Sequence, residues 1–305
     1  MKTDPWEILK DSFRTVIRNR CLWMFGFVIA LAGGGSQGYN LWVQAPLSGG
    51  VTGLAGARLS SFVRAHWIYA LIAGAVGLLV GLGLLCAGVI AQGSAIGAVA
   101  EVEGGGSPDV RGSLHWGRNA FLRFGVLVIG YAAVMSLVAV PSLLYWRAWS
   151  GTKQMVLPCL GGFALGMGFV VFSILAGILL ELSVRFVVLE GEGIMESLRR
   201  AVNLFRDWWK EVLACWFYAL LIGVLNLITM AVVIAGILEN PLSALFRSAY
   251  DHQSPWLFSL AIAAYFLAWG VAALLGTFFV ATSSALWTNT FLELEPVAVP
   301  GMHSP

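Results

Sequence analysis

The sequence predicts an all-α polytopic membrane protein, with six transmembrane helices arranged as three repeated hairpins and a cytoplasmic amphipathic helix before each hairpin. Three observations predict this class. The 305-residue chain is 59% hydrophobic and only 11% charged, whereas soluble domains are about a quarter charged. Several apolar stretches exceed the roughly 20 residues that cross a bilayer. Basic amphipathic sequence precedes more than one of these stretches. We therefore expect a single membrane domain over residues 1–305.

The amphipathic pattern is clearest in residues 193–213, where apolar residues recur at helical spacing beside a basic flank. The N-terminal residues share it, because Ser12-Phe13-Arg14 aligns with Ser197-Leu198-Arg199. A fainter copy begins at Ser113. Such helices are typical of a membrane interface. The basic residues predicted to contact the membrane surface or a partner are Arg14, Arg18, Arg199, Arg200, Arg206 and Lys210.

Three internal repeats follow from this pattern and from a recurring acidic pair. Each apolar region ends in Glu-x-Glu, at Glu101/Glu103, Glu190/Glu192 and Glu293/Glu295. We predict repeat 1 over 5–103, repeat 2 over 108–192 and repeat 3 over 194–295, followed by a tail over 296–305. Amphipathic helices are expected at about 5–20, 108–122 and 194–209.

The membrane segments are expected at 21–32, 67–100, 120–145, 155–188, 211–238 and 256–292. The first holds only a dozen apolar positions, which span about 18 Å against roughly 30 Å of hydrocarbon. We expect it either to extend back through the amphipathic part or to lie in a locally thinned bilayer.

Two glycine motifs predict close helix packing, because small residues let membrane helices approach each other. They are Gly77-x-x-x-Gly81 in the second segment and Gly162-x-x-x-Gly166 in the fourth.

A polar step recurs inside the predicted membrane segments, one to two turns before each Glu-x-Glu pair. Arg185 follows Glu181 by four residues, which permits an ion pair on one helix face. The plainer interpretation is hydrogen bonding between helices, and the functional one is a polar vestibule open to the cytoplasm. The residues of this polar layer are Gln92, Ser94, Glu181, Ser183, Arg185, Thr282 and Ser284.

The basic residues also predict orientation. Thirteen of the 18 Lys and Arg residues fall on one side of the predicted segments, so both termini are expected in the cytoplasm. These charges favour anionic lipid or an acidic partner surface, although the positive-inside rule alone also accounts for them.

No enzyme motif is found. The histidines His66, His115, His252 and His303 and the four scattered cysteines lack the spacing of a metal site or a catalytic triad. We therefore expect no cofactor and no metal, and the uneven charge gives no reason to expect nucleic acid. The Glu-x-Glu pairs suit solvated helix ends, or pairing with arginines of the amphipathic helices, better than acid–base chemistry, because alternate residues on a helix point in different directions.

Three stretches carry a family resemblance: EGEGIMESLRRAVNLFRDWWKEVL at 190–213, LKDSFRTVIRNRCLWMFGFVIALAGGG at 9–35 and SALWTNTFLELE at 284–295. They resemble bacterial polytopic membrane proteins related to the membrane domain of glycerophosphoryl diester phosphodiesterases. The family's His-Arg-Gly motif has no counterpart in this sequence. The resemblance therefore implies a six-helix module of a bacterial inner membrane and not the phosphodiesterase activity.

Two functions compete. The leading hypothesis is a non-enzymatic scaffold, assembly factor or accessory subunit of a membrane complex, which uses its glycine-lined helix faces and basic interfacial helices to bind partners. The expected partners are membrane lipids and other membrane subunits. The alternative is a transporter of a small solute or lipid with a cytoplasm-facing polar vestibule. Three parallel hairpins differ from the inverted repeats common in transporters, which favours the first hypothesis.

Overall fold

The computed structural model describes residues 4–32, 67–149, 156–233, 244, 248 and 255–295, and these residues form helices with no strand among them. The predicted all-α class is confirmed. The predicted tail over 296–305 lies outside the described residues. In chain order the elements are α1 (Pro5–Arg18), α2 (Arg20–Leu31), α5 (Trp67–Glu103), α6 (Val110–Trp149), α7 (Val156–Arg185), the π-helix η1 (Phe186–Glu190), α8 (Ile194–Asp207), α9 (Trp209–Val233) and α11 (Pro255–Leu294).

Five stretches of the described chain are long and apolar enough to cross a membrane, the pattern of a multi-pass membrane protein. They are Ala75–Glu103, Val110–Val140, Gly161–Glu190, Trp209–Val233 and Gly270–Leu294. Helix α2 is apolar but has only 12 residues. It does not extend back through α1 as one helix, because Asn19 between them has an extended backbone with φ −108° and ψ 97°. Of the two alternatives for the first membrane segment, a continuous helix through the amphipathic part is therefore wrong.

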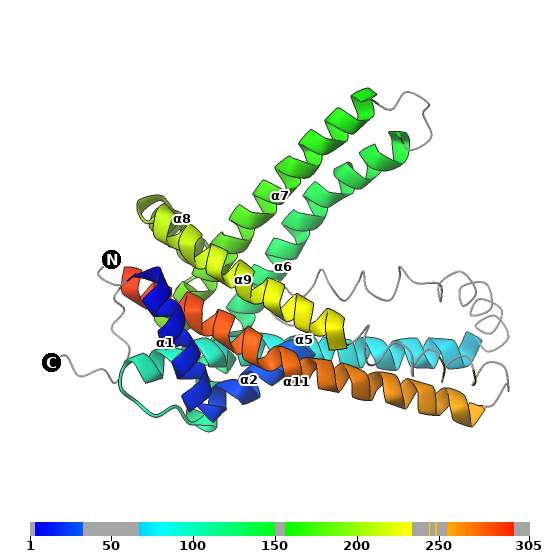
Figure 1. The fold of residues 1–305 in the computed structure, drawn as a ribbon, viewed down its shortest axis with the longest axis horizontal. Helices are drawn as coiled ribbons and strands as arrows, with labels where there is room; N and C mark the ends of the chain where they lie inside the picture. The colour runs from blue at the N-terminus through cyan, green and yellow to red at the C-terminus, as the bar shows by residue number, and fades with distance from the viewer. Residues whose placement is uncertain are drawn as a thin grey trace.

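Helices α2, α5, α9 and α11 run side by side as a bundle, and the α6–α7 hairpin leaves it at a steep angle (Figure 1). Helix α11 contacts α1, α2, α5, α7 and α9, so it is the central element. The hairpin joins the bundle through the packing of α6 on α5 and of η1 on both. All three predicted repeats therefore contribute to one assembly of helices.

Glycines bring α5 and α6 close together, but they are not the predicted ones. A Cβ at Gly93 would lie 2.9 Å from the Cα of Gly117, and one at Gly97 would overlap the Trp116 ring. Gly93-x-x-x-Gly97 is thus the motif that brings the two helices together. A Cβ at Gly117 would in turn overlap the backbone oxygen of Ile90.

Three of the four predicted motif glycines meet no helix of the described chain. A Cβ added at Gly77, Gly81 or Gly166 has nothing within 4 Å, and Gly162 is half-buried. Gly77, Gly81 and Gly166 therefore pack against no other helix of the described chain, and their role in helix packing stays a prediction. Their segments are long enough to leave the region where α5, α7 and α11 converge, so their faces stay open.

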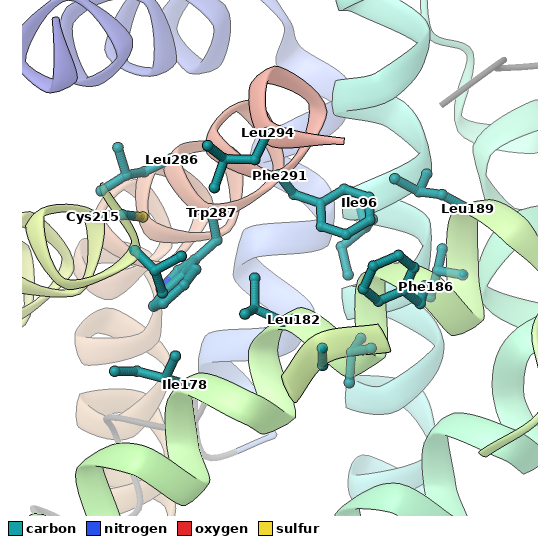
Figure 2. Close-up of a cluster of buried hydrophobic side chains, with 14 of the residues drawn as sticks. Ile96, Ile178, Leu182, Phe186, Leu189, Cys215, Leu286, Trp287, Phe291 and Leu294 are labelled. Carbon is teal, nitrogen blue, oxygen red and sulfur yellow. The ribbon is translucent and has the colours of Figure 1, made fainter. Parts of the chain in front are cut away.

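The core lies where the hairpin leaves the bundle (Figure 2). Phe186 of η1 and Phe291 of α11 meet edge to face at a centroid distance of 4.8 Å. Four consecutive residues of η1, Phe186 to Leu189, are buried, and they contact α5, α6, α7 and α8. Burying four consecutive side chains requires neighbours on every face, which this convergence provides.

Two of the three predicted amphipathic helices form separate elements. Asp4 caps α1 by accepting a hydrogen bond from the Trp6 backbone N–H at 3.1 Å, with Pro5 at the first helical position. Helix α8 covers most of the predicted 194–209. The third prediction, over 108–122, is wrong as a separate helix, because α6 runs without a break from Val110 to Trp149.

Candidate functional site

The ends of η1 and α11 meet the buried side of α8 in a cluster of carboxylates around one arginine. Arg200 donates from Nη2 to Glu295 at 2.6 Å and from Nη1 to Glu192 at 2.5 Å and to Glu190. Its guanidinium also lies over the Phe186 ring, 4.5 Å from the centroid. We call Arg200, Glu190, Glu192 and Glu295 the carboxylate collar. It joins three elements that are up to 105 positions apart in the chain, from Glu190 to Glu295.

Local backbone geometry presents these carboxylates. Gly191 ends η1 in the left-handed conformation with φ 68°, which glycine adopts without a Cβ penalty. Arg123 of α6 donates to the backbone oxygens of Gly191 and Glu192. The turn between η1 and α8 is therefore held from the α6 side while Arg200 holds it from the α8 side.

The collar stabilises the charged state of Arg200. Partial burial lowers its pKa, but the hydrogen bonds to Glu192, Glu295 and Glu190 outweigh burial and hold the pKa above its ordinary value. The Arg200 side chain is 29% exposed, so solvent still screens the cluster in part. The predicted pairing of Glu-x-Glu residues with an arginine is confirmed for the second and third pairs.

The first acidic pair binds different partners. Glu101 accepts hydrogen bonds from Trp116 Nε1 at 2.9 Å and from Ser113 Oγ at 3.3 Å, both near the start of α6. A hydroxyl and an indole thus take the place of the expected arginine at this repeat boundary.

The intramembrane polar layer is brought together only in part. Arg185 is fully buried and donates from Nη1 to Glu181 at 2.8 Å, so this predicted pair is confirmed. Its Nη2 lies 3.4 Å from the Ser284 backbone oxygen on α11, and its guanidinium lies 5.8 Å from the Trp287 ring centroid. Arg185 therefore links α7 to α11 where the hairpin leaves the bundle.

Two other members of the layer, Ser94 and Thr282, bond only their own helices. Ser94 and Thr282 are fully buried and donate to the backbone oxygens four residues earlier. Ser183 is fully buried, and the Oγ atoms of Ser183 and Ser284 have no hydrogen-bond partner among the described residues. Gln92 is half-buried on α5, and no described contact joins it to Glu181 or Thr282.

The remaining predicted basic residues are exposed on α1, α8 and the first turn of α9. Arg14 pairs with Asp11 at 3.2 Å and Arg206 lies 3.5 Å from Asp207. Arg18, Arg199 and Lys210 are exposed. Of the six basic residues predicted to contact the membrane surface or a partner, Arg200 is thus the one that the described structure shows bonded to other elements of the chain.

Sequence reasoning missed Arg123 and Asn289. The sequence patterns give neither residue a role of its own. Asn289 donates from Nδ2 to Ser12 Oγ at 3.2 Å and so attaches α1 to α11. The available signal was Ser12 itself, a small polar residue on the apolar side of α1.

The collar is suited to holding helix ends together, because one oxygen of each of its three carboxylates accepts a hydrogen bond from Arg200. The second oxygen of Glu192, Oε2, is buried and has no hydrogen-bond partner among the described residues. Within the described ranges, no group of three or more His, Cys, Asp or Glu side chains could hold a metal ion. Comparison of the chain with protein-family models, with curated proteins and with solved structures finds no match.

Proposed function

We propose that the protein is a non-enzymatic membrane module, a scaffold, assembly factor or accessory subunit that binds a second membrane protein through its α6–α7 hairpin. One observation carries this proposal: the six consecutive residues 163–168 of α7 are all exposed. Six residues exceed one helical turn, so no face of α7 is covered there by the described chain. An apolar helix bare on every side offers a large surface to another transmembrane helix.

Small residues on this hairpin support helix association over simple lipid contact. A Cβ at Gly125 or Gly130 of α6, or at Gly166 or Gly168 of α7, would have nothing within 4 Å. Interfaces between membrane helices are enriched in such residues because the backbones approach closely there.

A bulky substitution in the hairpin tests the proposal. A Cβ at position 166 has nothing within 4 Å, so Gly166→Leu should leave the thermal stability in detergent unchanged while a co-purifying subunit is lost. Gly270→Leu on α11 is the matched control, because a Cβ there also has nothing within 4 Å. If the wild-type protein purifies without any partner, or if both variants lose it equally, the hairpin is not the binding surface.

The proposal includes the finer architecture: six membrane segments in three hairpins, α2–α5, α6–α7 and α9–α11, with both termini in the cytoplasm. In support, the aligned serines Ser12, Ser113 and Ser197 are all fully buried, and the second and third Glu-x-Glu pairs meet at one arginine. The short α2 would lie in a thinned bilayer.

Cysteine labelling from one side of the membrane tests the topology. A cysteine introduced at Glu7 and one introduced at Glu196 should both react only from the cytoplasm. The resemblance to the glycerophosphoryl diester phosphodiesterase membrane domain agrees with this architecture and stays a prediction.

The transporter alternative has less support. A vestibule needs accessible polar groups, yet Arg185, Ser94, Ser183 and Thr282 are buried. Glu181→Gln separates the two functions, because it removes the charge that faces Arg185. Lost thermal stability supports the structural role. Unchanged stability with altered retention of a solute or lipid would favour the vestibule.

A further inference from the structure

Four kinds of surface follow one another around α8. The buried side holds Ser197, Ala201 and Leu204. Next comes an exposed apolar row, then an exposed basic row with Arg199 and Arg206, and then an acidic row with Glu196 and Asp207. The apolar row consists of Met195, Leu198 and Val202, which are 79%, 38% and 45% exposed. Trp209 and Lys210, also exposed, follow at the start of α9.

The position of α8 in the chain fixes where these rows lie. It connects the membrane-crossing stretch Gly161–Glu190 to the stretch Trp209–Val233, so both of its ends lie at the same membrane surface. The carboxylate collar and the contacts of its buried side with α7 and η1 hold it against the bundle. Its exposed rows are therefore presented at that surface in a fixed orientation.

We infer that this face of α8 binds the anionic phospholipids of the adjoining leaflet. Met195, Leu198 and Val202 enter the acyl boundary, and Arg199, Arg206 and Lys210 contact the phosphates. The order of the rows carries the inference: apolar, basic and acidic surfaces follow the change from acyl chains through phosphates to water. The lipid contact goes beyond the scaffold role and does not depend on it.

The test uses the full chain in detergent, supplied with phosphatidylcholine and phosphatidylglycerol, with bound lipid counted by native mass spectrometry. The wild-type protein should retain phosphatidylglycerol in preference to phosphatidylcholine. The triple variant Arg199→Gln, Arg206→Gln, Lys210→Gln should lose about fivefold in that preference per charge removed, or roughly a hundredfold in all. Arg200 stays intact, so the collar and the fold are kept.

The matched control is the triple variant Lys10→Gln, Arg14→Gln, Arg18→Gln, which removes the same charge from α1. Most of the apolar side of α1 is buried against the bundle, and only Trp6 and Ile17 are exposed there, so this variant should lose less of the preference than the α8 variant. Equal losses in the two variants, or undiminished preference in the α8 variant, would overturn the inference. It is overturned equally if the α8 variant keeps phosphatidylglycerol but sheds an acidic co-purifying protein, because the surface is then a protein contact.

Discussion

Helix α1 packs most of its apolar side against the bundle and leaves Trp6 and Ile17 exposed, whereas α8 leaves a whole apolar row exposed, although the two share one sequence pattern. In α1, Ile8, Leu9 and Val16 are buried, and Phe13 meets Phe278 of α11 at a centroid distance of 5.5 Å. In α8 the buried apolar residues are Ala201 and Leu204, and Arg200 supplies the strongest attachment through its three carboxylates. The comparison teaches that a helical period identifies an amphipathic helix but not what covers its apolar side.

Introducing a charge on the apolar side should reveal the largest difference in stability between variants of α1 and α8. Val16→Asp places a carboxylate at a site with no exposure, and we expect it to lower the free energy of unfolding by about 4 kcal/mol. Val202→Asp on α8 lies on a surface that no other described helix covers and should cost far less, at most about 1 kcal/mol. Denaturation midpoints in one detergent measure both. Similar losses would mean that the apolar row of α8 is covered after all.

Removing the collar arginine should have the next largest effect. Arg200→Gln leaves Glu190, Glu192 and Glu295 close together without their cation, which we expect to cost about 2 kcal/mol. Arg199→Gln, one residue away and exposed, should be near neutral. Adding Glu192→Gln to the Arg200 variant should restore part of the stability, because it relieves repulsion. No restoration would indicate that the collar acts through packing on Phe186 and not through charge.

The smallest contrast concerns two aligned serines. Ser12→Ala removes the hydroxyl that Asn289 bonds from α11, so we expect a loss of about 1 kcal/mol. Ser197→Ala removes only a bond to its own helix, at the Ile194 backbone oxygen, and should cost a few tenths of a kcal/mol. Thermal unfolding of the two variants side by side checks the order, and a reversed order would contradict the assignment of α1 as the more tightly packed helix.

Local patterns in the sequence predicted local features well. Hydropathy located the long helices, the amphipathic period located α1 and α8, and the spacing of Glu181 and Arg185 predicted their ion pair. Each of these depends on residues a few positions apart, where helix geometry alone fixes proximity.

Features that depend on distant segments could not be predicted in this way. Gly77 and Gly93 both begin a Gly-x-x-x-Gly motif, but only the second lies where α6 crosses α5. The sequence likewise suggested that carboxylates pair with arginines, yet it did not indicate that Arg200 alone would collect three of them. Both outcomes depend on which helices converge in the fold. A helical period in the local sequence does not contain that information.

The contact between Ser12 and Asn289 joins residues 277 positions apart, which bears on the order of events during synthesis. At ribosomal rates of about 5–20 residues per second, α11 follows α1 by on the order of tens of seconds. Throughout that interval the side of α1 that carries Val16 lacks its main partner, since α1 contacts α11 more than any other element. Helix α1 is therefore made well before its main partner and is among the last of the described helices to reach its place.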